Sequence, residues 1–186
     1  MARIKVIQKD EAEGRLHEIY SDIINKRGKL AEVHKIQSLR PESIVHHMDL
    51  YMEIMFTRSE LSRAEREMMA VVVSVSNGCN YCMLHHSEAL NHYWKNDIKI
   101  SSLKNDFNTS DLTKKEISLC EFAQKLTLRP ENFQEEAPTE ALRENGLTDN
   151  AILDATLVVA YFNFVNRIVL ALGVESDENE LKGYNF

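Results

Sequence analysis

Apolar residues recur at helical spacing along nearly the whole chain, and this periodicity limits the fold more than any other feature of the sequence. The first such segment places Leu16, Ile19, Tyr20, Ile23 and Ile24 on one face of an α-helix. Only three prolines and six glycines interrupt the 186 residues, which favours long helices over many short strands. The sequence therefore predicts an all-α fold.

Capping residues mark where several of the expected helices begin. Ser62 and Glu65 form a capping box that opens a helix running to about residue 76, and Thr113 with Glu116 forms a second one. Further helices are expected over residues 16–24, from Pro41, over about 79–94, over 140–145 and over 148–172.

The two ends of the chain lack this helical pattern. Residues 1–14, with a strand-like stretch at 4–7, are expected to form an extended N-terminal arm, and residues 175–186 a C-terminal tail. A chain of 186 residues can bury a real core, so we expect a single domain over residues 1–186.

The charge balance argues against some classes of partner. With 22 basic and 29 acidic residues, the formal net charge is −7, which leaves no broad basic face for nucleic acid or for an anionic membrane surface. The N-terminus lacks the apolar run of a signal peptide, and polar side chains interrupt the most apolar windows, residues 68–75 and 151–172. We therefore expect a cytoplasmic protein that does not span a membrane.

Two of the three cysteines lie in one motif, E-x11-C-x2-C-x3-H, made of Glu67, Cys79, Cys82 and His86. The C-x2-C spacing brings two sulfurs together across one helical turn. The Asn-Gly break at 77–78 places them at a helix start, where free N–H groups and the dipole stabilise a thiolate. His86 follows Cys82 by four residues on the same face and can take its proton. These residue types favour thiol–disulfide chemistry.

Glu67 can take part only if the chain reverses direction. It lies twelve residues before Cys79, which is about 18 Å along a straight helix. If the break at 77–78 folds the two helices into a hairpin, Glu67 can orient or reprotonate His86. The motif therefore predicts a helical hairpin.

Two other interpretations of the motif remain open at this point. Two thiolates, His86 and Glu67 could complete a four-ligand metal site, although structural zinc sites more often use a second Cys/His pair and Cys120 is the only other cysteine. The C-x2-C pair could also be structural. On the redox interpretation, which we favour, we expect neither a cofactor nor a bound metal.

Three further histidines and the third cysteine are expected to have structural positions. His85 points about 100° away from His86 around the helix, which favours the surface. His46 and His47 have no ligand partner at a suitable spacing and are expected at a helix surface or subunit interface. Cys120 lies on an apolar helix face and is expected to be a buried thiol.

The four motif residues resemble the active-site signature of the alkylhydroperoxidase D-like (AhpD-like) branch of the carboxymuconolactone decarboxylase superfamily. The similarity continues through 112–127, 142–147 and the run YFNFVNR at 161–167, and it covers about residues 15–175. The run is typical of the peroxidase-related branch. The resemblance implies an AhpD-like helical fold whose helical hairpin carries the CxxC motif, and a homo-oligomer that is a dimer or a ring of dimers.

The resemblance also implies an activity, the reduction of hydroperoxides by a dithiol peroxidase. In that scheme Cys82 attacks the peroxide and becomes a sulfenic acid, Cys79 resolves it to a disulfide, and Glu67 and His86 act with water as a proton relay. An external dithiol or thioredoxin-like donor reduces the pair again. Position alone would favour Cys79 as the more activated thiol, because it is nearer the helix start. A lactone lyase, the chemistry of the decarboxylase branch, is the remaining alternative.

Tyr81 departs from the family pattern. The best-known peroxidases of the family have a second histidine immediately before the second cysteine, and this chain has Tyr81 there. A phenol, with a pKa of about 10, is a poor base at neutral pH but can donate a hydrogen bond to a thiolate. The departure predicts slow peroxidase turnover or a different substrate.

Overall fold

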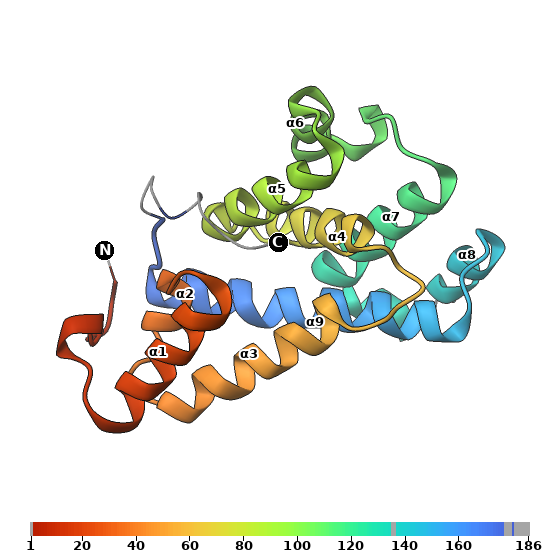
Figure 1. Ribbon diagram of the computed structural model, residues 1–186. Coiled ribbons are helices and arrows are strands. Elements are labelled where there is room, and N and C mark those ends of the chain that lie inside the picture. The colour runs from red at the N-terminus through yellow and green to blue at the C-terminus, as the bar shows by residue number, and fades with distance from the viewer. Residues whose placement is uncertain (1, 135–136, 177–179, 181–186) are drawn as a thin grey trace.

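The computed structural model describes residues 2–134, 137–176 and 180. Within these ranges the chain is helical and contains no strand, which confirms the all-α prediction (Figure 1). The α-helices are α1 (Gly14–Arg27), α2 (Glu32–Lys35), α3 (Pro41–Phe56), α4 (Arg63–Ser76), α5 (Asn80–Trp94), α6 (Asp97–Asn105), α7 (Lys114–Leu128), α8 (Pro138–Glu144) and α9 (Asp149–Leu172). Short 3-10 turns lie at η1 (Lys9–Glu11), η2 (Phe107–Thr109) and η3 (Pro130–Gln134).

Both predicted capping boxes are present. At the start of α4 the Glu65 backbone N–H donates to the Ser62 hydroxyl, and the Ser62 N–H donates to the Glu65 carboxylate at 2.7 Å. Thr113 and Glu116 make the same reciprocal pair at the start of α7. Each box satisfies backbone N–H groups that would otherwise have no partner in the first turn.

The N-terminal arm is less extended than the sequence predicts, because η1 interrupts it. The arm reaches the far end of the chain, where the Arg3 backbone N–H donates to the Leu172 carbonyl at 2.9 Å. Residues 177–179 and 181–186 of the predicted C-terminal tail lie outside the described residues.

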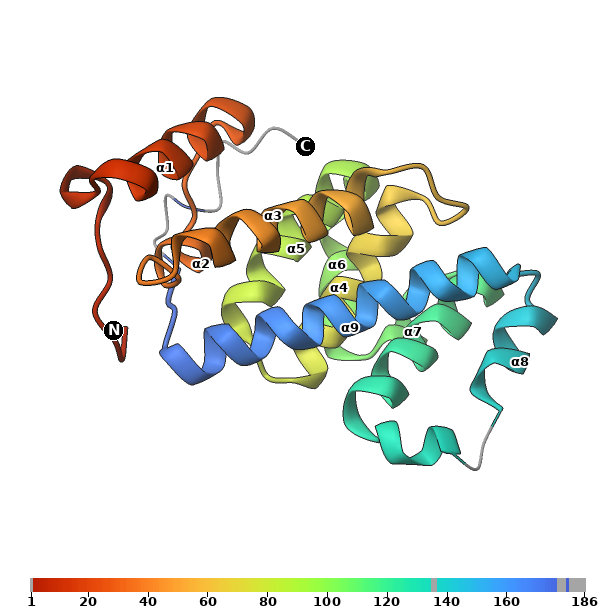
Figure 2. The same ribbon diagram turned by 90° about the horizontal axis from the view of Figure 1, so that it is seen from below.

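Helix α4 lies at the centre of the molecule. Every residue from 65 to 74 is buried, and the helix packs against α5, α7, α9, α6 and α3. Figures 1 and 2 show α4 and α5 as consecutive helices that fold back on each other, with α9 running along the same core. Since α4 is covered on all sides, its charged side chains must find their partners inside the protein.

Helices α1 and α3 form a second, smaller core beside the first. Leu16, Ile19, Tyr20 and Ile23 of α1 bury their side chains with Ile44 of α3. The hydroxyl of the buried tyrosine donates to the carbonyl of residue 7 at 3.0 Å, so the arm also holds α1 in place. This packing brings the C-terminal end of α1 to the edge of the main core (Figure 2).

One helix of the described chain, α9, is long and apolar enough to cross a membrane when judged by length and composition alone. In this fold 44% of its most apolar window is buried, and it packs against α3, α4 and α7. A core helix has the same length and composition, so packing within the chain accounts for the buried part of the apolar surface of α9.

Candidate active site

The break between α4 and α5 folds these helices into the hairpin that the motif requires. Gly78 has φ +66, a left-handed conformation that favours glycine. Next to it, the Asn77 side-chain amide donates to the amide oxygens of Asn163 and Asn166 on α9, at 3.1 and 3.0 Å. The turn is thus fixed both by its own backbone and by the C-terminal helix.

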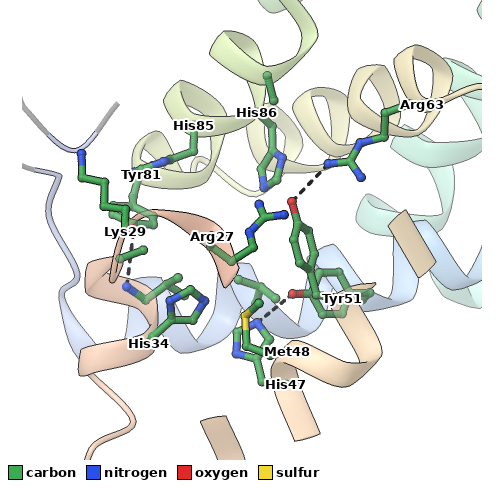
Figure 3. A pocket seen from close by; sticks show the side chains of 15 residues that line it. Arg27, Lys29, His34, His47, Met48, Tyr51, Arg63, Tyr81, His85 and His86 are labelled. Atoms are coloured by element: carbon green, nitrogen blue, oxygen red, sulfur yellow. Dashed lines mark hydrogen bonds between the residues drawn. The ribbon is translucent and has the colours of Figure 1, made fainter. Parts of the chain in front are cut away.

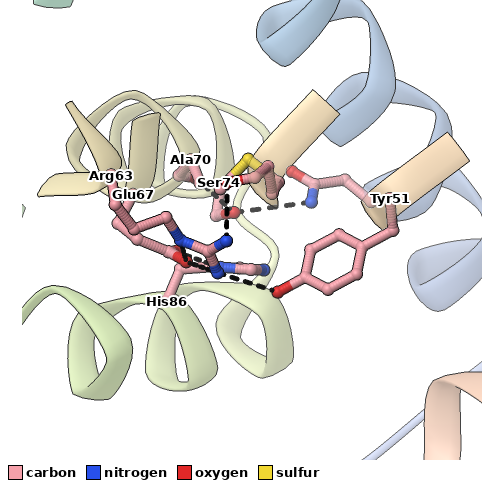
Figure 4. A network of polar contacts seen from close by, with 8 residues as sticks. Tyr51, Arg63, Glu67, Ala70, Ser74 and His86 are labelled. Carbon is pink, nitrogen blue, oxygen red and sulfur yellow. Dashed lines mark hydrogen bonds and ion pairs between the residues drawn. The ribbon is translucent and has the colours of Figure 1, made fainter. Parts of the chain in front are cut away.

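Glu67 and His86 meet across this hairpin, as predicted. Oε2 of Glu67 lies 2.7 Å from Nδ1 of His86, and the carboxylate is fully buried (Figure 4). Burial alone would raise the pKa of Glu67, but the charges and hydrogen bonds of His86 and Arg63 lower it below its usual range. The glutamate is therefore a buried anion that orients the imidazole.

Arg63 completes this pair, and the sequence analysis missed it. Its guanidinium donates to Oε1 of Glu67 at 2.6 and 3.0 Å, to the Met55 carbonyl at 2.7 Å and to the Tyr51 hydroxyl at 3.3 Å. The spacing of four residues between Arg63 and Glu67 on one helix was a signal that could have identified the pair. Arg63 ties the carboxylate to the end of α3.

The two motif thiols lie together at the start of α5. Cys79 is the N-cap residue and Cys82 the third helical residue, and both are buried free thiols. A hydrogen bond from Cys82 lowers the pKa of Cys79 below its ordinary value, whereas the same bond and burial raise the pKa of Cys82. The pair therefore holds its first negative charge on Cys79, while Cys82 keeps its proton.

Asn166 joins the thiols to α9. It is fully buried, its amide donates to the Ser74 hydroxyl at 3.4 Å, and it also hydrogen-bonds to Cys82, which favours the thiolate. An asparagine inside an apolar helix was the sequence signal for a polar contact of this kind. The YFNFVNR run thus contributes directly to the thiol environment.

A cavity of about 100 Å³ lies beside His86 (Figure 3). Tyr161 forms one wall, and burial first, then the charges of Tyr51, Cys82 and Glu67, raise the pKa of its phenol well above the ordinary value. Neither thiol is among the described residues that line the cavity. The lining residues are Arg27, Lys29, Ala31, Val33, His34, His47, Met48, Tyr51, Arg63, Tyr81, His85, His86, Ala89, Tyr161 and Val165.

Two histidines expected at the surface face this cavity instead, so those expectations were wrong. His47 is 5% exposed, with Nδ1 at 2.7 Å from the Gln37 amide and Nε2 at 2.7 Å from the Tyr161 hydroxyl. Burial lowers the pKa of His47 to about 4 and that of His85 to about 3. Both rings are neutral at physiological pH. Cys120, by contrast, is a buried thiol as predicted.

Tyr81 has its hydroxyl turned toward the C-terminal segment. It donates to Oε1 of Glu180 at 2.6 Å and accepts from the Val33 backbone N–H at 3.3 Å. The ring lies 4.4 Å from that of His85, measured between centroids. The phenol that stands in place of a second histidine is therefore part of a polar cluster with a carboxylate.

The geometry weakens the metal interpretation of the motif. In the part of the chain that the structure describes, no group of three or more His, Cys, Asp and Glu side chains could hold a metal ion. Glu67, which that interpretation needs as a fourth ligand, has its two oxygens bound to Arg63 and His86. The site consists of a dithiol and a carboxylate–imidazole pair.

Comparisons with known proteins agree with this description. The profile of the carboxymuconolactone decarboxylase family matches residues 44–97, which contain the whole motif. The uncharacterized protein YdfG of Bacillus subtilis (strain 168) is 26% identical over 136 residues, which cover 73% of this chain and 90% of that protein.

Several solved structures share the fold. An uncharacterized peroxidase-related protein from Silicibacter sp. TM1040 superimposes with a TM-score of 0.83 at 26% identity, covering 98% of each chain. An AhpD-core, peroxidase-related protein from Ralstonia eutropha JMP134 gives 0.86 at 24% identity, covering 97% of this chain and 94% of its own. The debrominase Bmp8 gives a TM-score of 0.78 at 18% identity, covering 96% of this chain and 95% of its own.

The fold and the site define a class of all-α proteins that carry a dithiol on a helical hairpin. Residues 44–97 match the carboxymuconolactone decarboxylase family, and the fold is that of AhpD-like, peroxidase-related proteins.

Proposed function

We propose that the protein is a thiol-dependent peroxidase that reduces organic hydroperoxides through a reversible Cys79–Cys82 disulfide. The observation that carries the proposal is the 2.7 Å contact between Glu67 and His86 of the thiol-bearing helix. A buried carboxylate that orients an imidazole four residues after a thiol on one helix is an arrangement suited to general acid–base catalysis. The peroxidase-related relatives support the same conclusion at the level of the family.

In the proposed reaction the Cys82 sulfur attacks the distal oxygen of ROOH. An S–O bond forms and the O–O bond breaks, giving a sulfenic acid and an alkoxide, which takes a proton from His86 to become ROH. The Cys79 sulfur then displaces the hydroxyl of the sulfenic acid, which takes the proton of the Cys79 thiol and leaves as water, and the disulfide forms. A dithiol or thioredoxin-like donor supplies two electrons and two protons to restore both thiols.

We assign the attack to Cys82, although the resting charge lies on Cys79. A proton that moves along their hydrogen bond from Cys82 to Cys79 converts the resting pair into the reactive one, and Asn166 favours the resulting thiolate. The charge of Cys82 also contributes to the raised pKa of Tyr161 on the cavity wall.

Thiol counting tests the peroxidase proposal. Reduced protein treated with substoichiometric hydroperoxide should lose two thiols for each peroxide consumed. Cys120→Ser should behave like the wild type, because Cys120 is outside the pair. An unchanged thiol count, or loss of two thiols in Cys82→Ser, would sink the proposal. Lyase activity that survives loss of both motif cysteines would favour the lactone alternative.

Trapping of the sulfenic acid tests the assignment of the two sulfurs. With dimedone present, Cys79→Ser should form one adduct at Cys82 when peroxide is added, and Cys82→Ser should form none. An adduct at Cys79 in the second variant, with none in the first, would reverse the roles of the two residues.

We also propose that the protein is a cytosolic homo-oligomer, either a dimer or a ring of dimers. A redox-active pair needs a reducing compartment to be regenerated. The outer face of α9 exposes Leu153, Leu157 and Phe164, at 57%, 41% and 48% of their surface. Their spacing places these side chains on one side of the helix, and an apolar surface of this kind is typical of subunit contacts.

A further inference from the structure

Arg27, at the C-terminal end of α1, places a cation in the cavity without an acidic partner. Its guanidinium points toward Tyr51 and His86 (Figure 3). The guanidinium carbon lies 5.5 Å from the ring centroid of Tyr51 and 4.9 Å from that of Phe56. No described residue accepts a hydrogen bond from it or forms an ion pair with it, so its five donors are available to a ligand.

The other groups around the cavity leave this charge uncompensated. No described lining residue is an aspartate or glutamate. Arg63 also lines the cavity, but Glu67 neutralises it. The carboxylate of Glu180 contacts Tyr81, His85 and the backbone N–H of residue 32 rather than Arg27.

Three of the histidines that line the cavity add no positive or negative charge near pH 7. Burial lowers the pKa of His34 to about 3, that of His47 to about 4 and that of His85 to about 3, so all three are neutral near pH 7. In addition, Nδ1 of His34 is buried without a hydrogen-bond partner in the structure. The cavity therefore presents the unpaired cation of Arg27 together with a polar nitrogen atom of His34 that a ligand could satisfy.

The size and walls of the cavity limit what can enter. Its volume of about 100 Å³ is less than the roughly 150 Å³ that holds a benzene ring. Tyr51 and Tyr161 supply flat apolar surface. Arg27 and Met48 also line a second cavity of about 350 Å³ between α1 and α3, so longer substituents can extend past Arg27.

We propose that Arg27 binds the carboxylate of a small aliphatic acid in this cavity, so that the substrate is a carboxylate-bearing hydroperoxide. The assignment of a hydroperoxide rests on the proposed peroxidase function, whereas the anion site does not. With the carboxylate on Arg27, the other end of a short chain lies toward His86 and Tyr161 on the cavity wall. A guanidinium pairs with a planar carboxylate through two parallel hydrogen bonds, and the carboxylate is unchanged by the reaction.

Ligand binding tests the anion site without any redox step. Butanoate and butanamide have the same size and differ in charge, and NMR titration of the reduced protein measures the binding of each. Butanoate should bind at least tenfold more tightly than butanamide, and Arg27→Gln should remove most of this preference. Arg27→Lys should retain part of it. The control Arg129→Gln removes one exposed charge outside the cavity and should keep the full preference.

Equal binding of the two probes, or no detectable binding of butanoate, would overturn the proposal. A preference that Arg27→Gln leaves intact would overturn it as well. Thermal melts of each variant show whether it is folded. Because no thiol reacts in this titration, a failed thiol count together with a preference for butanoate would reject the peroxidase and retain the anion site.

Alkylation provides a second measurement near the thiols. Iodoacetate and iodoacetamide transfer a two-carbon group to a thiolate with release of iodide, and only the first reagent carries a carboxylate. The rate of alkylation by iodoacetate, divided by the rate by iodoacetamide, should be severalfold lower in Arg27→Gln than in the wild type. The same ratio should be unchanged in Arg129→Gln. A ratio that is the same in wild type and Arg27→Gln would contradict the proposed position of the anion. Activity then links the two proposals: the same variant should raise KM more for a carboxylated hydroperoxide than for cumene hydroperoxide.

Discussion

Glu67 is the buried carboxylate on which two other groups of the site depend. Its buried carboxylate satisfies Arg63 and His86 together, so its replacement affects both partners. Glu67→Gln keeps the shape and removes the charge. We expect the rate of peroxide-driven disulfide formation to fall about 100-fold or more, and the free energy of unfolding to fall by about 3 kcal/mol, because a buried cation loses its partner.

Stopped-flow measurement of thiol loss and urea unfolding check these two effects separately. Glu121→Gln removes an exposed carboxylate from α7 and is the control. Wild-type rates in Glu67→Gln would show that the carboxylate–imidazole pair takes no part in the reaction.

His47 makes the free energy of unfolding depend on pH, in a range above the one in which Glu67 acts. Its folded-state pKa of about 4 lies below the ordinary 6.5, so the unfolded chain binds a proton that the folded one excludes. Stability from this group is therefore complete above pH 6.5 and is lost as the pH falls toward 4, at about 1.4 kcal/mol per pH unit. Glu67, whose pKa is lowered from 4.5, acts only below that range.

In chemical denaturation between pH 4.5 and 6, His47→Gln should therefore lower the slope of stability against pH by about one proton. The exposed residue His46 provides the matched control, and His46→Gln should leave the slope unchanged. Identical slopes in wild type and His47→Gln would show that this imidazole is not held neutral by the fold.

The sequence predicted site residues that lie close together along the chain. The meeting of Glu67 with His86 followed from the helical period and one turn signal. Arg27 and Tyr161 could not be assigned to the site, because they come from α1 and α9, whose positions depend on tertiary packing. His47 was placed wrongly for the same reason: α9 supplies the Tyr161 hydroxyl that makes its burial tolerable.

At the level of elements, the turn between α4 and α5 determines the site geometry. A Cβ added to Gly78 would have no atom within 4 Å, so its φ of +66 is the only cost of a substitution. Gly78→Ala should lower the free energy of unfolding by about 1–2 kcal/mol, and Gly78→Asn by less, since asparagine tolerates this conformation. Urea unfolding measures both. Gly146, also at positive φ but outside the hairpin, provides a control: Gly146→Ala should destabilise the protein without slowing thiol chemistry.

Long helices with clear capping residues could be predicted from the sequence, whereas short elements could not. Helices α4, α7 and α9 were expected from capping residues and periodicity, and the structure has them. The short helix α2 and the turn η1 were not expected, because a segment of three or four residues shows no period. Residues on both sides of α2, Ala31 and Ile36, are buried, so packing rather than local preference explains it.

For the whole molecule, the outer face of α9 tests the proposed assembly. Phe164→Asp places a charge on this face and should reduce the mass measured by light scattering to that of a smaller oligomer or a monomer. Ile98→Asp is the control, because Ile98 on α6 is 80% exposed away from α9. An unchanged mass for Phe164→Asp would place the subunit contact elsewhere.

Helices α4 and α5 alone hold the dithiol, the carboxylate–imidazole pair and Arg63 in one continuous segment, residues 63–86. The cavity beside it combines residues of this hairpin with walls from distant parts of the chain, with Arg27 from α1 and Tyr161 from α9. Reactivity thus depends mainly on one continuous stretch of sequence, whereas the choice of substrate depends on that stretch together with the outer helices. Descendants of such a protein can exchange the outer helices and acquire new substrates while the reactive hairpin stays intact.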